Sequence, residues 1–148
     1  LAYRGDVGWT RETHLVSGNR TTEEEIKKYL ESVNTHLFVA LENNEVVACV
    51  CVEEKSDAAY IGMLAVHPRF QKKGMGKNIL AQAENYALAT LEKNKFVMLV
   101  VSQRKELIEY YQRRGYVQTG KTDAYPIGIK VGVPVQTGLT IEYLEKNI

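Results

Sequence analysis

The fold is decided by the stretch Gln71-Lys72-Lys73-Gly74-Met75-Gly76-Lys77, because regular structure is predicted on both sides of it. Upstream, residues 59–66 are apolar and prone to form a strand, and Pro68 ends that strand because proline cannot donate to a ladder. Downstream, apolar residues recur at helical spacing, namely Ile79, Leu80, Ala83, Tyr86, Ala87 and Leu91. The predicted order is therefore a strand, a basic loop with two glycines, and a helix.

The composition of this loop suits an anion. Residues 69–77 contain no acid and four cationic side chains: Arg69, Lys72, Lys73 and Lys77. Gly74 and Gly76 let the backbone come close to a ligand, and the free N–H groups at a helix start favour a negative charge there. The sequence predicts a phosphate-bearing ligand, and a glycine turn with solvated lysines is the alternative.

Two common nucleotide-binding motifs do not match this loop. The Walker loop requires Ser or Thr after its lysine, but Asn78 follows Lys77, and Gln71 occupies the position of its first glycine. The dinucleotide fingerprint requires a third glycine where this chain has Ile79. The pattern that remains is Gln-x-x-Gly-x-Gly at a turn from strand to helix.

A second strand and helix follow the first pair. Residues 96–101 form a continuous apolar run, which predicts a buried strand. A helix is predicted from about Lys105 to Arg114, with Gly115 well placed to end it. This helix contains the pair Tyr110-Tyr111, and Tyr116 follows the glycine.

These two segments resemble the GNAT superfamily of acetyl-CoA-dependent N-acetyltransferases. Residues 71–76 are similar to the pyrophosphate loop of that family, and Tyr111, Gly115 and Tyr116 are similar to its aromatic-Tyr-x-x-x-Gly-Phe/Tyr signature. The resemblance covers at least residues 38–116. One departure is Arg104, because the family often has Asn seven residues before the signature tyrosine. Arg104 is expected either to replace that contact to the pantetheine arm or to face the acceptor.

The element order predicts an α+β fold with one mixed, mostly antiparallel sheet and helices on both faces. A helix is expected from Glu23 to about Ser32, and further strands are expected at 36–41, 46–52, 117–122 and 139–144. The first two of these strands form a hairpin that turns at residues 42–45. The resemblance implies that the sheet is splayed between the strands at 59–66 and 96–101, with the pantetheine arm in the gap.

The whole chain, residues 1–148, is predicted to be a single GNAT-like domain. Its net charge of +1 and the lack of an apolar run of 18 residues argue against nucleic-acid and membrane partners. Cys49 and Cys51 are interpreted as reduced core residues, which predicts a cytoplasmic protein. The chain begins with Leu1 rather than Met, so we expect that a preceding piece, which carries the first strand in the resembled family, is absent.

The resemblance implies acetyl-CoA as co-substrate, no metal, and a set of residues that bind the cofactor. These are Leu64, Ala65, Val66, Gln71, Lys72, Lys73, Gly74, Met75, Gly76, Lys77, Arg104 and Tyr111. The acceptor is expected to be a small-molecule or peptide amine, and a homodimer is compatible with this assignment. Trp9, Arg20 and Tyr125 are candidates to bind the acceptor, although Trp9 also fits a core position and Arg20 a solvated one.

The predicted reaction moves an acetyl group from acetyl-CoA to a primary amine by direct attack in a ternary complex. Tyr111 matches the general acid of the family; the alternative is that it only packs beside Tyr110. Glu53 is the nearest carboxylate by topology and is the candidate base, because Tyr60 stands where some members have Glu; water is the alternative. Two other classes stay open: a non-catalytic acyl-CoA sensor, and a structural domain whose loop binds no nucleotide.

Overall fold

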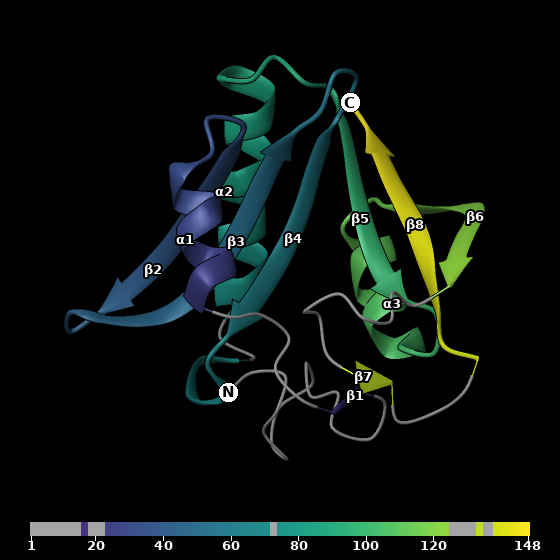
Figure 1. The fold of residues 1–148 in the computed structure, drawn as a ribbon, viewed down its shortest axis with the longest axis horizontal. Coiled ribbons are helices and arrows are strands. Elements are labelled where there is room, and N and C mark those ends of the chain that lie inside the picture. The colour runs from purple at the N-terminus through teal and green to yellow at the C-terminus, as the bar shows by residue number, and fades with distance from the viewer. Residues whose placement is uncertain (1–15, 18–22, 72–73, 125–132, 135–137) are drawn as a thin grey trace.

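The computed structural model describes residues 16–17, 23–71, 74–124, 133–134 and 138–148 (Figure 1). The described strands form a six-stranded sheet in the order β2-β3-β4-β5-β8-β6 and a small two-stranded sheet, β1-β7. The strands of the large sheet are β2 (Thr35–Glu42), β3 (Glu45–Glu54), β4 (Ala59–Val66), β5 (Lys95–Val101), β6 (Val117–Ala124) and β8 (Thr140–Asn147). The small sheet pairs β1 (Val16–Ser17) with β7 (Val133–Pro134). The helices are α1 (Glu23–Glu31), α2 (Met75–Ala89) and α3 (Lys105–Arg113), with one 3-10 turn, η1 (Pro68–Phe70).

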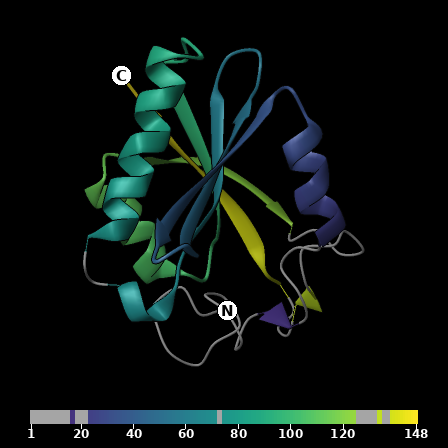
Figure 2. The same ribbon diagram turned by 90° about the vertical axis from the view of Figure 1, so that its left-hand side faces the viewer.

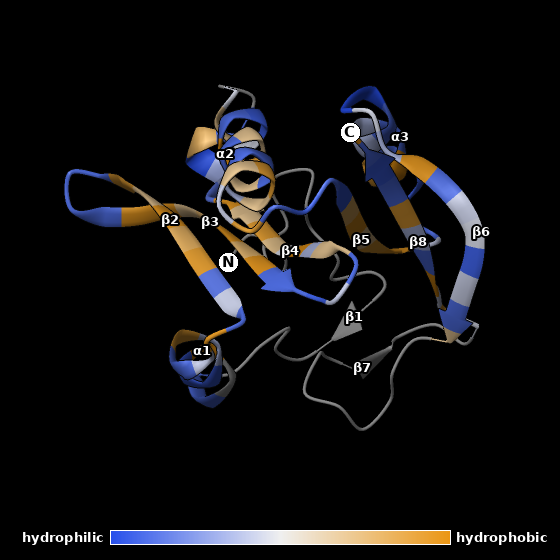
Figure 3. Cartoon of the chain, turned by 90° about the horizontal axis from the view of Figure 1, so that it is seen from above, coloured by the Kyte–Doolittle hydropathy of each residue, from blue (hydrophilic) through white to orange (hydrophobic). Residues whose placement is uncertain are grey.

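Helices cover both faces of the large sheet. Figures 2 and 3 show α2 and α3 on one face and α1 on the other. All ladders of this sheet are antiparallel except that between β4 and β5, which is parallel. The predicted α+β class, with one mixed and mostly antiparallel sheet between helices, is confirmed.

The core lies between α2, α3 and the central strands. α2 turns a stripe of small and branched residues toward the sheet, namely Ile79, Leu80, Ala83 and Ala87. They pack with fully buried residues of β3, such as Val50 and Val52. The predicted continuous burial of β5 is interrupted at Leu99, which is 46% exposed. Because side chains alternate along a strand, Leu99 faces away from Met98 and Val100, which both lie in the core.

The β2–β3 hairpin turns where the sequence predicts. Asn43 and Asn44 both have positive φ angles, 52° and 65°. Two successive left-handed residues match the right-handed twist of the flanking strands, and asparagine tolerates this conformation better than most residues. The turn places β3 between β2 and β4, as expected for a strand that is apolar on both faces.

β4 and β5 separate over most of their length. They pair only at Ala59 with Phe96 and at Tyr60 with Val97, so the ladder is open toward the carboxyl ends of both strands. Figure 1 shows the two strands diverging toward the end of the sheet that carries the β4–α2 loop. This is the splay that the family resemblance implies.

β4 also carries a bulge beside this opening. Cys49 pairs with Ala65 and Cys51 with Gly62, so β4 contains one residue more than β3 between these pairs. Met63 lies in the bulge with a φ of 52°, and its carbonyl oxygen accepts a hydrogen bond from the thiol of Cys49 at 3.2 Å. A bulge re-aims the backbone of the strand that carries it, and here that strand borders the opening.

Candidate active site

The loop after β4 is folded back onto the end of the strand. The amide of His67 donates to the carbonyl of Val47 at 2.8 Å, which extends the antiparallel pairing by one bond. The 3-10 turn η1 then reverses the chain, because Pro68 fixes φ at its start. The side-chain amide of Gln71 donates to the carbonyl oxygen of Val66 at 2.8 Å and so closes the loop.

Gly74 allows α2 to begin directly after this loop. It is the N-cap of α2 with a φ of 78°, a left-handed conformation that glycine adopts without strain. The first bond of the helix runs from the amide of Asn78 to the carbonyl of Gly74, at 3.0 Å. The amides of residues 75–77 therefore have no acceptor within the helix, and the first turn carries no acid. The helix start is suited to an anion.

A pocket of about 360 Å³ lies over this helix start. Its lining comes from the end of β4, the loop, the first turn of α2 and the last turn of α3: Val66, Gln71, Gly74, Gly76, Lys77, Tyr110, Arg113 and Arg114. A side chain at Gly76 would begin 3.5 Å from the Tyr110 hydroxyl and 3.5 Å from a methyl group of Val66. We call this cavity the loop pocket.

The end of α3 adds positive charge to the loop pocket. The guanidinium carbons of Arg114 and Arg113 lie 5.1 Å and 5.9 Å from the centroid of the Tyr110 ring. Burial raises the pKa of Tyr110, and the two arginines partly offset that rise. The Tyr110 phenol is therefore protonated near neutral pH and can donate a hydrogen bond into the pocket.

Tyr111 belongs to the core rather than to the lining of the loop pocket. It is 5% exposed and shares the buried face of α3 with Leu107 and Ile108. Its ring centroid lies 5.4 Å from that of Tyr110 and 6.0 Å from that of Tyr116. Gly115 ends the helix with a φ of 102°, and the chain turns into β6 beside this aromatic group.

Arg104 is the N-cap of α3 and is only 1% exposed. Its Nε donates to a carboxylate oxygen of Glu106 at 2.6 Å. Because β4 and β5 are parallel, Arg104 follows β5 at the same edge of the sheet at which the loop follows β4. It is not part of the lining of the loop pocket.

The other predicted residues fall into three groups. Leu64, Ala65 and Val66 are the last residues of β4, beside the opening, and Met75 packs against the core from the first turn of α2. Glu53 lies opposite Tyr60, where β4 and β5 are still paired, and its carboxylate forms an ion pair with Lys55 at 2.8 Å. Five predicted residues lie outside the described residues: Trp9, Arg20, Lys72, Lys73 and Tyr125.

Three residues of the loop pocket are absent from the sequence prediction: Tyr110, Arg113 and Arg114. Their spacing carried a signal, since residues three and four apart lie on one face of a helix. Arg113 and Arg114 come three and four residues after Tyr110, so the three side chains form a polar stripe on the helix. This stripe lies next to the apolar stripe that contains Tyr111. The sequence prediction rests on the apolar stripe alone.

No helix within the described ranges has the length and apolar character needed to cross a membrane. In the same part of the chain, no group of three or more His, Cys, Asp or Glu residues is arranged to hold a metal ion.

Comparison with solved structures finds the same fold in several acetyltransferases. A GNAT family acetyltransferase from Elizabethkingia anophelis with acetyl-CoA bound is 20% identical, with 86% of this chain and 84% of that chain covered and a TM-score of 0.67. The ribosomal-protein-S18-alanine N-acetyltransferase of Escherichia coli is 17% identical, with 86% and 77% covered and a TM-score of 0.68. A variant of the spermidine N-acetyltransferase of Vibrio cholerae is 16% identical, with 84% and 72% covered and a TM-score of 0.65.

A family model described as an acetyltransferase (GNAT) domain matches residues 12–131, which is most of the chain. That span contains the opened ladder, the glycine loop and the α3 signature. The resemblance seen in the sequence is confirmed, and it assigns an acyltransferase activity. The chain belongs to the GNAT family of acetyltransferases.

Proposed function

We propose that the protein transfers an acetyl group from acetyl-CoA to a primary amine by direct attack in a ternary complex. The observation that carries this proposal is the loop pocket, a basic cavity over a helix start at the open end of β4 and β5. Acetyl-CoA in the similar structure from Elizabethkingia anophelis supports the choice of co-substrate. Family membership favours an enzyme over a non-catalytic sensor.

The described residues of the loop pocket carry charge of the sign that this co-substrate requires. The amides of residues 75–77 and the side chain of Lys77 are proposed to bind the diphosphate, because a helix start favours anions. Leu64, Ala65 and Val66 are proposed to line the path of the pantetheine arm, with Arg104 near its far end. When bound, acetyl-CoA supplies an activated acyl group as a thioester.

The acceptor amine must be neutral to attack. At pH 7 this costs about 4.6 kcal/mol for a lysine-like amine and about 1.4 kcal/mol for an α-amine with a pKa near 8. We propose that water takes the proton, because Glu53 lies where the strands are still paired and is held by Lys55. Glu53 as the base is the alternative.

Two groups are proposed to stabilise charge as the acyl group moves. A backbone N–H among residues 64–66, next to the bulge at Met63, would donate to the carbonyl oxygen as it becomes negative. Tyr111 would donate its phenolic proton toward the departing sulfur. A phenol is a weaker acid than a thiol by roughly 2 kcal/mol, so this donation must strengthen as negative charge develops.

The acceptor is proposed to be a small-molecule or peptide amine. Among proteins of this fold, one is named for spermidine and another for the alanine of a ribosomal protein, so the fold serves both classes. A cytoplasmic location, a single domain over residues 1–148 and a homodimer stay predictions, as do the roles of Trp9, Arg20 and Tyr125 in binding the acceptor.

An acetylation screen tests this function. Acetyl-CoA is incubated with the protein and a panel of polyamines, amino acids, aminoglycosides and peptides with free N-termini, and the release of free CoA thiol is measured. Release with one acceptor class, and mass spectrometry of the acetylated product, would support the proposal. A thermal shift with acetyl-CoA but no release with any amine would favour the sensor, and no shift would contradict both.

A further inference from the structure

A second pocket of about 290 Å³ adjoins the loop pocket on the side of α2. The two pockets share Lys77, Arg113 and Arg114, which therefore form their common border. The second pocket also reaches Glu84 on α2 and Lys146 on β8. We call it the rear pocket.

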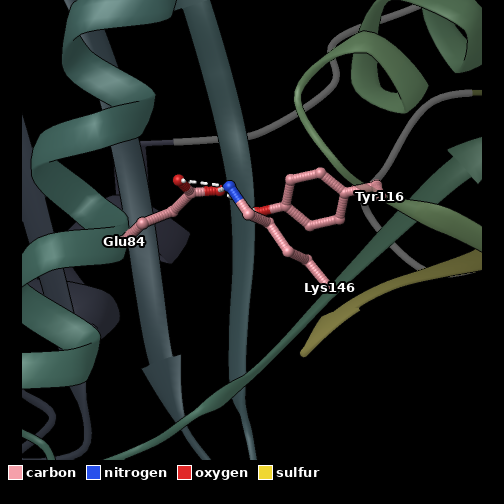
Figure 4. Close-up of polar contacts among 3 residues, drawn as sticks. All are labelled: Glu84, Tyr116 and Lys146. Carbon is pink, nitrogen blue, oxygen red and sulfur yellow. Dashed lines mark hydrogen bonds and ion pairs between the residues drawn. The ribbon is translucent and has the colours of Figure 1, made fainter. Parts of the chain in front are cut away.

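Among the described residues that line the rear pocket, the one carboxylate is already engaged. The ammonium group of Lys146 lies 3.1 Å and 3.3 Å from the two carboxylate oxygens of Glu84. Figure 4 shows these two side chains pointing toward each other. The hydroxyl of Tyr116 donates to the same carboxylate at 2.7 Å. Burial beside Glu84 raises the pKa of Tyr116, so this phenol keeps the proton it donates. The charge of Glu84 is therefore balanced, and of the described lining residues the cations Lys77, Arg113 and Arg114 remain for a ligand.

The two arginines at the border have no acidic partner within the described part of the chain. Both guanidinium groups lie over the Tyr110 ring, with their central carbons 5.1 Å from its centroid for Arg114 and 5.9 Å for Arg113. The Nε of Arg114 is buried and has no hydrogen-bond acceptor among the described residues. A buried donor without an acceptor is unfavourable and calls for an explanation. A guanidinium group matches the oxygens of a phosphate in charge and geometry.

We propose that the rear pocket binds the 3′-phosphate of the ribose in acetyl-CoA, with Arg113 and Arg114 as the residues that determine this specificity. The inference rests on the proposed function, because it requires the diphosphate of the same ligand in the loop pocket. That ligand carries two phosphate groups separated by a ribose and therefore needs two adjoining anion sites. A phosphate monoester carries a charge of about −1.5 to −2 at pH 7, which Arg113 and Arg114 can balance while Lys77 faces the diphosphate.

Binding of CoA and of 3′-dephospho-CoA, measured by titration calorimetry, tests this inference. The wild-type protein is expected to bind CoA at least about tenfold more tightly, since a hydrogen bond to a charged group typically contributes that much or more. Arg113→Gln and Arg114→Gln should each reduce this ratio, and the double variant should bind both ligands within about twofold. Lys105→Gln removes an exposed cation from the first turn of the same helix and should keep the wild-type ratio.

The outcomes separate this inference from the proposed function. Equal affinity of the wild-type protein for both ligands would overturn the rear-pocket assignment and leave the acetyl-CoA proposal intact. Failure to bind either ligand would overturn both. If Arg114→Gln does not fold, as shown by circular dichroism, the exposed Arg113→Gln variant decides alone: an unchanged ratio contradicts the inference and a reduced ratio supports it.

Discussion

The side-chain amide of Gln71 donates a 2.8 Å hydrogen bond to the backbone carbonyl oxygen of Val66. Val66 is the last residue of β4, and Gln71 is the first residue of the glycine loop, directly after η1. The bond therefore fixes the loop at the strand end and sets the position of the α2 start relative to the opening between β4 and β5. The glutamine of the loop motif thus holds the loop in place by a hydrogen bond to the backbone at the end of β4.

Gln71→Ala should weaken cofactor binding because it removes this bond. A loss of about 1 kcal/mol, the typical net value of one hydrogen bond, corresponds to roughly fivefold in the dissociation constant of acetyl-CoA. Calorimetric titration measures this change. Gln82→Ala, at an exposed position of α2, is the matched control and should bind like the wild type. An equal affinity in both variants would show that the bond does not position the loop.

Substitutions of Gly76 should depend on the size of the new side chain. A Cβ atom at this position would lie at ordinary contact distance, 3.5 Å, from both Tyr110 and Val66, so Gly76→Ala should fold. The added methyl groups in Gly76→Val would fill the loop pocket. At 100-fold excess over its dissociation constant, acetyl-CoA should stabilise the wild type by about 2.7 kcal/mol.

A thermal-shift assay should show that Gly76→Val loses this stabilisation. Ala89→Val, at the exposed far end of α2, places a valine in the same helix away from the loop pocket and should retain the full shift. A full shift in Gly76→Val would mean that the cofactor does not approach the helix start.

Tyr111→Phe and Tyr110→Phe should affect different kinetic constants. Tyr111→Phe keeps the buried ring and removes the proposed proton donor, so kcat should fall by ~10²–10⁴ with little change in KM. Tyr110→Phe removes a hydroxyl from the loop pocket, so KM for acetyl-CoA should rise by about fivefold with kcat nearly unchanged. Steady-state kinetics with one amine acceptor measures both. Wild-type kcat in Tyr111→Phe would leave Tyr111 as a packing residue.

Glu53→Gln tests the route of the amine proton. If water takes the proton, kcat/KM should rise with pH toward the pKa of the acceptor, and this profile should be the same in the variant. If Glu53 is the base, the variant should be slower at neutral pH and lose less at high pH, where neutral amine is plentiful. Comparing the two pH profiles on one acceptor decides between these outcomes.

Cys51 should make the fold sensitive to alkaline pH. Burial, with smaller effects from Glu53 and Cys49, raises the pKa of the Cys51 thiol from 9.0 to about 11. The unfolded chain therefore loses this proton first, and the free energy of unfolding should fall as pH rises from about 9 to about 11. In urea titrations over this pH range, the free energy of unfolding of Cys51→Ala should fall less steeply than that of the wild type. Identical slopes would show that the thiol does not contribute.

The sequence predicts those features of the fold that depend on local patterns. The strand at 59–66, the helix that buries Ile79 and Leu80, and the Asn43-Asn44 turn follow from periodicity and turn chemistry, and the structure confirms them. The bulge at Met63 does not follow, because it arises from the register of β4 against β3. The sequence of β4 alone does not determine its register against β3, and therefore does not show that an extra residue lies between the partners of Cys49 and Cys51.

The site was harder to predict for a related reason. The loop residues could be found because their chemistry is contained in one short segment. Tyr110, Arg113 and Arg114 reach the same pocket only because α3 ends over the start of α2, which is a tertiary arrangement. Glu53 differs from these three residues, because the strand order alone places it near the site. In the structure it lies where β4 and β5 are still paired, whereas the loop pocket lies at their open end.

The short ladder between β4 and β5 also divides the sheet into two halves, which we call leaves. The first leaf is β2, β3 and β4, the second is β5, β8 and β6, and two residue pairs join them in the ladder. Glu84 fastens these leaves on one side, because it belongs to α2 on the first leaf and holds Lys146 and Tyr116 of the second. Proteins open in cooperative units that are smaller than the whole fold. A ligand bound between β4 and β5 would therefore couple the two halves of the sheet. Its release would allow each half to open locally without the other.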